Sequence, residues 1–117
     1  MAENITFEEN KLILPTKTVP FRHKIEQILE TDLRVFVLLD IPNDVDNNEN
    51  IYCFTKGGDL VWLVQPVSMF NPNIKQFSPY VGMHLLENGN VSATNFFGIN
   101  YEISAKNGKI LASKMVK

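Results

Sequence analysis

Three turns that contain glycine constrain this chain more than any other feature of its sequence. They span residues 56–59, 87–90 and 106–108, and each separates two short runs of apolar, β-branched or aromatic residues. Glycine and Asn-Gly pairs supply the positive φ that tight hairpin turns require. Runs of this kind on either side of such turns are typical of antiparallel strands, and helical periodicity is nearly absent. The sequence therefore predicts a mainly β protein built from hairpins.

The expected fold is an antiparallel sheet of consecutive hairpins, in the form of a curved sheet or a small sandwich. We expect about seven to nine strands and at most one short helix. A chain of 117 residues with 44% hydrophobic content suits one hydrophobic core, so residues 1–117 are expected to form a single β domain. The predicted core side chains are Val35, Val37, Leu39, Tyr52, Phe54, Trp62, Val81, Phe96, Tyr101 and Ile103.

The first third of the chain contains one clear strand and one ambiguous segment. Residues 33–40 form a nearly continuous apolar run, as expected of a central strand that is buried on both faces. Residues 24–30 fit either a helix face or a strand, and we favour the strand. Residues 4–7 and 11–14 suggest a first hairpin, after which Pro15 and Pro20 indicate a loop or an edge segment.

Two loops are candidates for partner binding. Residues 42–50 form a polar loop that we expect to be solvent-exposed, and the connection over residues 66–79 is unusually long for a segment without secondary structure. The first region carries acids that would steer a basic partner, and the second carries apolar side chains that would anchor it. The predicted partner-binding residues are Asp40, Asp44, Asp46, Glu49, Met69, Phe70 and Phe77.

Composition indicates a cytoplasmic protein that binds neither membranes nor nucleic acid. The first ten residues carry acids instead of the positive charge of a secretion signal, and no apolar run reaches the length of a membrane helix. The single cysteine, Cys53, has no partner for an intrachain disulfide, which favours a reducing compartment. A formal net charge of −2 argues against a nucleic-acid surface.

Local sequence phrases resemble two groups of known proteins. The phrases "IYCFTKGGDLVWLV", "MHLLENGNVSATN" and "YEISAKNGKILASK" resemble the blade hairpins of quinoprotein-type β-propellers, although the chain has strands for only about two blades. The order "ENIYCFTKGGDLVW", "SPYVGMHLLENGNVSATNFFGINYEI" and "NGKIL" resembles short bacterial proteins of uncharacterised function, some of which neutralise a toxin encoded beside them. This second resemblance implies an immunity protein, and it assigns no functional residue.

Catalytic and metal sites are not indicated by the sequence. His23, Cys53 and His84 lie about 30 residues apart on different predicted segments, which does not suit a zinc site. The stretch from Asp44 begins like a calcium loop, but Glu49 occupies the position where such a loop needs glycine. No phosphate-binding glycine motif occurs, so we expect no cofactor.

We therefore expect a non-enzymatic protein-binding module, most specifically an immunity protein that binds a basic toxin domain. One alternative is a small metal-free nuclease or hydrolase that uses His23 and His84, which would require these side chains and Cys53 to converge in one pocket. Another alternative is a homo-oligomeric structural protein that self-associates through an exposed β edge.

Overall fold

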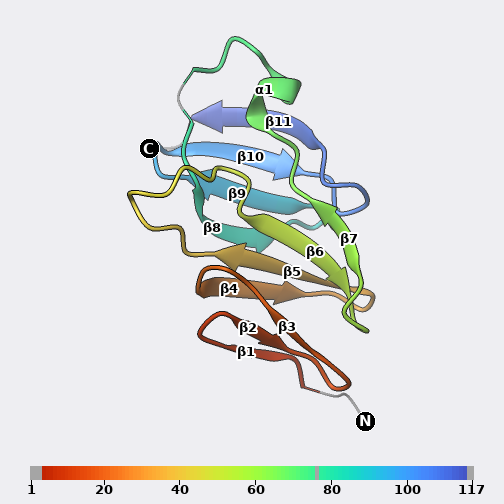
Figure 1. The fold of residues 1–117 in the computed structure, drawn as a ribbon. Coiled ribbons are helices and arrows are strands. Elements are labelled where there is room, and N and C mark those ends of the chain that lie inside the picture. Colours follow the sequence, from red (N-terminus) through yellow and green to blue (C-terminus); the bar gives the residue numbers. More distant parts are fainter. Residues whose placement is uncertain (1–3, 76, 116–117) are drawn as a thin grey trace.

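The computed structural model describes residues 4–75 and 77–115. Within these ranges the chain forms three antiparallel sheets and one four-residue helix, α1 (Val67–Phe70) (Figure 1). The N-terminal sheet contains β1 (Thr6–Glu8), β2 (Lys11–Ile13) and β3 (Thr18–Pro20). The middle sheet contains β4 (Ile25–Glu30), β5 (Arg34–Leu39), β6 (Ile51–Thr55) and β7 (Leu60–Leu63). The C-terminal sheet contains β8 (Tyr80–Leu85), β9 (Val91–Asn95), β10 (Ile99–Ile103) and β11 (Ile110–Met115).

The expectation of a mainly β fold of consecutive hairpins with one short helix is confirmed. Every pairing inside the three sheets joins strands that are consecutive in the chain. The expected number of strands was too low, because the described residues contain eleven. The N-terminal strands are only three residues long, and Pro20 lies at the end of edge strand β3, where a missing N–H is tolerated. Residues 24–30 contain strand β4, as we favoured.

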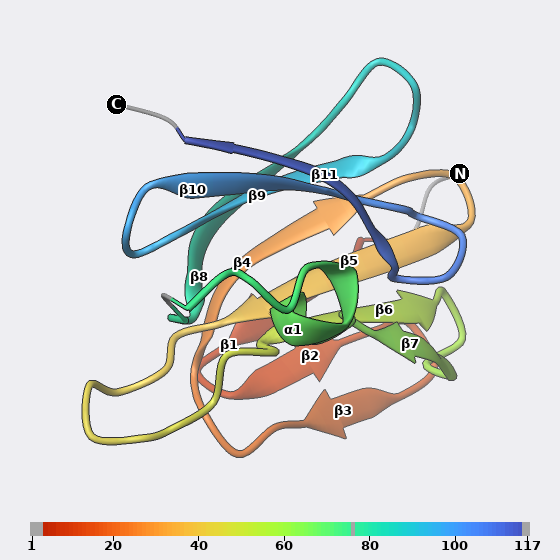
Figure 2. The same ribbon diagram turned by 90° about the horizontal axis from the view of Figure 1, so that it is seen from above.

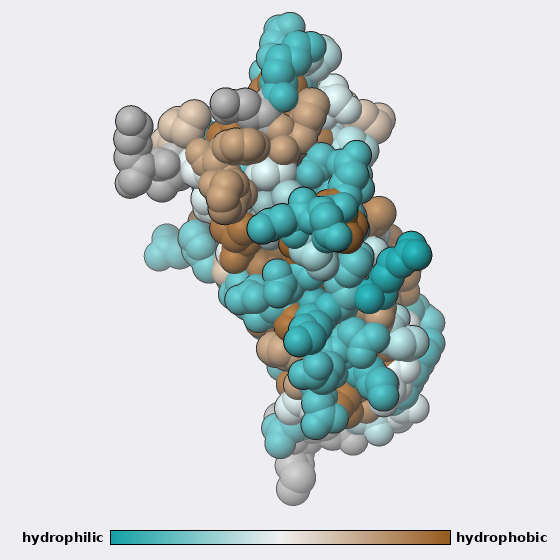
Figure 3. Space-filling model, turned by 60° about the vertical axis from the view of Figure 1, so that its left-hand side comes forward, coloured by the Kyte–Doolittle hydropathy of each residue, from teal (hydrophilic) through white to brown (hydrophobic). Residues whose placement is uncertain are grey.

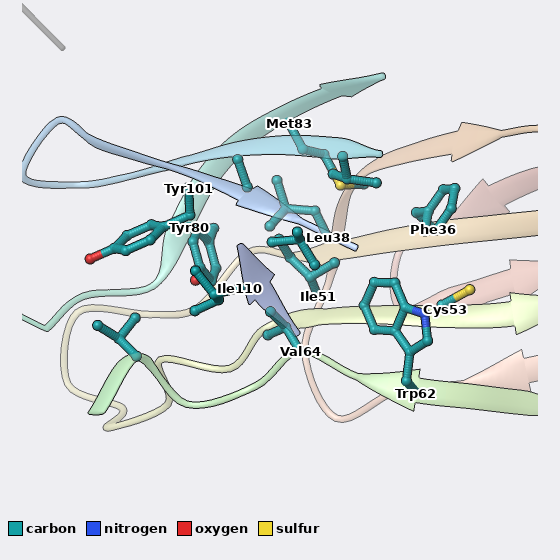
Figure 4. Close-up of a cluster of buried hydrophobic side chains, with 14 residues drawn as sticks. Phe36, Leu38, Ile51, Cys53, Trp62, Val64, Tyr80, Met83, Tyr101 and Ile110 are labelled. Carbon is teal, nitrogen blue, oxygen red and sulfur yellow. The ribbon is translucent and has the colours of Figure 1, made fainter. Parts of the chain in front are cut away.

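The middle sheet is covered on both of its faces, and β5 shows this most directly. Phe36 and Leu38 belong to a hydrophobic cluster with side chains of the C-terminal sheet (Figure 4). Val35, Val37 and Leu39 belong to a second cluster that includes side chains of the N-terminal sheet. The view from above shows the same three layers (Figure 2). Strand β5 is therefore the doubly buried central strand that its apolar run predicted.

The glycine turns adopt the conformation that the sequence predicted. Gly58, Gly89 and Gly108 all have positive φ, at 97°, 91° and 77°. Gly108 is also held against the ring of Trp62, since a Cβ built at this glycine would lie 2.7 Å from the indole. The Trp62 indole Nε1 donates to the carbonyl oxygen of Ala105 at 2.9 Å. The third hairpin thus fixes the position of the single tryptophan.

Two of the predicted core residues are exposed. Val81 is 53% exposed because β8 has a register irregularity between Tyr80 and Gly82, and the extra residue of a bulge leaves the regular alternation of the strand. Phe96 is 74% exposed because it follows the last residue of β9. Tyr52 is half-buried, and its ring lies 5.2 Å from that of Phe21. The other seven predicted core residues are buried.

Three side-chain amides join the middle and C-terminal sheets. The Gln27 amide pairs with the backbone of Met83, donating to its carbonyl at 2.7 Å and accepting from its N–H at 3.1 Å. Gln65 accepts from the Ile110 N–H at 3.0 Å. Asn50 pairs with the backbone of Tyr80 in the same two-bond manner as Gln27 with Met83. These amides satisfy backbone groups of β8 and β11 that lie at the edges of their sheet.

Candidate functional site

A groove of about 340 Å³ lies where the loop after β5 meets the segment that leads into β8. It is lined by residues 39–43 and 78–81, together with Glu26, Val45 and Phe96. Its walls therefore come from four separate parts of the chain: β4, the loop after β5, the start of β8 and the turn after β9. A pocket of this size is at the small end of the range for binding sites, and it would take one or two inserted side chains.

Asn50 holds the two walls of this groove together. Its side chain is fully buried, and Nδ2 donates to the carbonyl oxygens of Leu39 at 2.8 Å and Tyr80 at 2.9 Å. The Tyr80 N–H donates to Asn50 Oδ1 at 2.9 Å. One amide therefore fixes the end of β5 against the beginning of β8. The expectation that all of residues 42–50 are solvent-exposed is wrong at Asn50, because this amide replaces the water that its backbone partners would otherwise need.

Exposed apolar side chains lie beside the groove. Phe96 and Val81 both line it, and the ring of Phe97 packs edge-on against that of Phe96 with centroids 6.0 Å apart. The Phe96 backbone is held in place, since its N–H donates to Ser78 Oγ at 3.0 Å. Hydrophobic surface gathers in the upper half of the face shown in Figure 3, next to hydrophilic surface. Apolar patches rimmed by polar residues mark interaction sites in many proteins.

The rim of the groove is acidic. Glu26 and Asp40 belong to its lining, and no lysine or arginine does so among the described residues. Asp44 and Asp46 are exposed on the loop that supplies Asn43 and Val45 to the lining, a loop that projects from the molecule in Figure 2.

Two further charged residues, Glu49 on the same loop and Lys24 just before β4, bear on the charge of this rim. Burial, and secondly the charge of Asp46, raise the pKa of the half-buried Glu49 carboxyl above its ordinary value. The Asp40 N–H donates a hydrogen bond to the backbone carbonyl oxygen of Lys24 at 2.8 Å, while the Lys24 ammonium lies 3.8 Å from the carboxylate of Glu9. The groove therefore offers negative charge to a partner.

The structure brings only some of the predicted binding residues together. Asp40 lines the groove, while Asp44 and Asp46 lie on its loop. Phe77 is 44% exposed and directly precedes Ser78, which is part of the lining. Met69 and Phe70 lie elsewhere, on α1, which packs near β11 (Figure 1).

Of the residues that line the groove, sequence reasoning named only Asp40 as a binding residue; those that it missed include Glu26, Val81 and Phe96. The last two were assigned to the core because they continue the apolar runs of their strands. The available signal was the consecutive Phe96-Phe97 pair at a predicted strand end. Two adjacent residues at the end of a strand point to opposite faces, so both rings cannot enter one core.

The three residues considered for catalysis lie on different parts of the fold. Cys53 is fully buried between the middle and C-terminal sheets, and burial raises the pKa of its thiol to about 11. His84 is exposed on β8, and His23 lies in the connection between β3 and β4. None of the three lines the groove between residues 39–43 and 78–81, and His84 lines a separate groove on the C-terminal sheet. These three side chains therefore do not converge in one pocket.

Across residues 4–75 and 77–115, no group of three or more His, Cys, Asp and Glu side chains is placed to hold a metal ion. The helix of this part of the chain, α1, lacks the length and apolar character needed to cross a membrane.

Comparison with known families gives one assignment for the chain. A family model described as a domain of unknown function, DUF7957, matches residues 2–115. The chain belongs to the DUF7957 family. The match covers all three sheets, so the groove, its acidic loop and the exposed phenylalanines are all within the DUF7957 domain. A search of curated proteins returned no match.

Proposed function

We propose that this DUF7957 protein is a non-enzymatic binding module that takes a basic protein partner at the groove between residues 39–43 and 78–81. The observation that carries the proposal is the position of Phe96 and Val81, two strongly exposed apolar side chains, in the lining of a groove that also contains Glu26 and Asp40. Covering an exposed aromatic side chain with a partner removes its apolar surface from water, which favours binding. Aromatic anchors dominate the energetics of protein interfaces.

The rigidity of the site supports binding to a protein surface. The Phe96 N–H is hydrogen-bonded to Ser78 Oγ, and Asn50 joins the two walls of the groove through three buried hydrogen bonds. A preformed site loses less conformational entropy on association than a mobile one. The groove would accept an apolar side chain of the partner, while the carboxylates around it would pair with lysine or arginine residues.

The carboxylates of this loop would chiefly accelerate the encounter. Asp44 and Asp46 are exposed, and charges of this kind raise association rates and fix orientation while contributing less to the final affinity. Their influence extends about 8 Å at physiological ionic strength, so binding should weaken as salt increases. An immunity protein that neutralises a basic toxin domain is the narrower form of this proposal, and the partner would then be a toxin encoded beside this protein.

The test uses the tagged full-length protein to recover its partner at low and moderate salt, followed by titration calorimetry with the purified partner. Phe96→Ala should weaken binding by about 2 kcal/mol, roughly 30-fold, as expected for loss of an aromatic anchor. Leu33→Ala is the matched control, because Leu33 is 71% exposed but lies in the turn between β4 and β5. It should leave affinity unchanged.

A second pair of variants tests the acidic rim. The triple replacement of Asp40, Asp44 and Asp46 by asparagine should flatten the dependence of affinity on salt. The control removes the same charge at exposed positions elsewhere, with the substitutions Asp32→Asn, Asp59→Asn and Glu87→Gln. Equal salt dependence in the two triple variants would remove the acidic loop from the account. Unchanged affinity of Phe96→Ala would refute the groove as the binding site.

A further inference from the structure

The outer face of the C-terminal sheet contains a second groove, of about 490 Å³. It lies on the side of this sheet that faces away from the hydrophobic cluster in Figure 4, since its lining alternates with the buried residues of β9 and β10. Its volume falls within the range of small-molecule binding sites. Six polar side chains carry the argument, and they are His84, Ser92, Thr94, Asn100, Glu102 and Lys114.

Strand register explains why this face is hollow. Ser92 lies directly opposite His84 on one side and Glu102 on the other, while Asn100 lies opposite Thr94 and Lys114. The small side chains of β9 thus occupy the middle, and the longer side chains occur on the strands around them. Gly82, opposite Thr94, has no heavy atom within 4 Å of the place where a Cβ would stand.

Polar groups in the floor of this groove are already ordered. The Asn100 Nδ2 donates to Ser92 Oγ at 2.8 Å and to Thr94 Oγ1 at 2.9 Å. Because the oxygens of both hydroxyls accept hydrogen bonds from Asn100, the hydroxyl hydrogens of Ser92 and Thr94 remain available to donate to a ligand. Ser92 is 5% exposed, so its hydroxyl is a nearly buried group at the base of the groove. The floor therefore presents hydroxyl donors at fixed positions.

The carboxylate in the wall is ordered as well. Glu102 Oε2 accepts hydrogen bonds from Asn88 Nδ2 at 3.0 Å and from Asn90 Nδ2 at 2.9 Å. These bonds lower the pKa of Glu102 below its ordinary value and keep it ionised. Asn90 is itself fixed, since its Oδ1 accepts from the Ala105 N–H at 3.1 Å. The second oxygen of Glu102 therefore provides an oriented acceptor.

We propose that this groove is a binding site for a neutral sugar. A sugar hydroxyl both donates and accepts, and the groove offers donors at Ser92, Thr94 and Lys114 together with acceptors at Asn100 and Glu102. The negative charge of Glu102 and the positive charge of Lys114 offset each other, which favours an uncharged ligand. An apolar partner surface would bury these polar groups without giving them hydrogen-bond partners, which is energetically unfavourable.

The test is an NMR titration of the ¹⁵N-labelled full chain with the methyl glycosides of glucose, galactose, mannose and N-acetylglucosamine. At least one glycoside should give saturable shifts at Ser92, Thr94 and Asn100. Thr94→Val preserves the shape of the side chain but removes its hydroxyl, and it should weaken that binding about five- to tenfold. Thr6→Val makes the same change at an exposed position on β1 and should leave the binding constant unchanged.

Two results would overturn the proposal. The first is the absence of saturable shifts at these three residues with all four glycosides at millimolar concentrations. The second is unchanged affinity of Thr94→Val, provided that its spectrum shows a folded protein. Shifts confined to Phe96 and Val81 would place the sugar in the other groove and would also refute this site.

Discussion

Replacement of Asn50 by alanine should be strongly destabilising, although this residue lies at the end of a polar loop. Its side chain makes three hydrogen bonds of 2.8–2.9 Å to the backbone of Leu39 and Tyr80, all of them buried. A typical hydrogen bond contributes about 0.5–1.5 kcal/mol net, and backbone groups left unpaired in the interior cost more, about 1–3 kcal/mol each. The expected loss is therefore about 3–5 kcal/mol of the free energy of unfolding.

A loss of this size is a large share of the roughly 5–15 kcal/mol that stabilises a domain. Each kcal/mol shifts Tm by about 3–6 °C in a protein of this length, so Asn50→Ala should lower Tm by roughly 10–30 °C. Urea denaturation followed by fluorescence is a suitable assay, because the chain has a single tryptophan and Trp62 is buried. Asn43→Ala, an exposed change in the same loop, should remain within about 0.5 kcal/mol of the parent.

Asn50→Asp provides a second readout that alanine does not. The aspartate would lose both donated hydrogen bonds and place a carboxylate among carbonyl oxygens, so its pKa in the folded state should rise above the unfolded value of about 3.9. An acid with a raised folded pKa destabilises the protein increasingly as pH rises above the unfolded pKa. This variant should therefore recover stability relative to the parent as pH falls from 7 towards about 4. A loss below about 1 kcal/mol for alanine, with no such pH dependence for aspartate, would refute the reasoning.

Three further predictions follow from other contacts. Gly108→Ala should lower the free energy of unfolding by more than about 2 kcal/mol in urea denaturation, because its Cβ would lie 2.7 Å from the Trp62 indole. Gly89→Ala is the control, since Gly89 has a similar φ but free space around it, and a loss of about 1 kcal/mol is expected. Equal losses would contradict this explanation. Gln27→Leu should speed amide hydrogen exchange at Met83, and unchanged exchange would show that the amide pair contributes little. Burial raises the pKa of Cys53 to about 11, so at pH 8 the protein should react with a thiol reagent only on unfolding. The free energy of unfolding should fall as pH rises from about 8.5 to 11. Rapid labelling of the folded protein would contradict the burial of this thiol.

Much of the fold follows from local sequence. The glycines at the three predicted turns adopt the positive φ for which they were singled out, and β5 is buried on both faces as its unbroken apolar run indicates. Turn conformation and strand periodicity depend on residues that are close in sequence, so they can be predicted without knowledge of distant partners. The loop acids Asp44 and Asp46 are exposed for the same local reason, since consecutive polar residues find no apolar face to join.

The candidate sites required the tertiary structure. The periodicity of a strand defines two faces but does not show which face another sheet will cover, and a bulge such as the one near Val81 changes the alternation within one strand. Phe96 therefore has the sequence of a core residue and the position of a surface residue. Asn50 shows the converse: it is a polar residue in a polar loop, yet it is buried because its amide donates a hydrogen bond to the Tyr80 carbonyl of β8, 30 residues later in the chain. Sequence determined the hairpins, whereas the packing of one sheet on another decided which side chains remained free to bind.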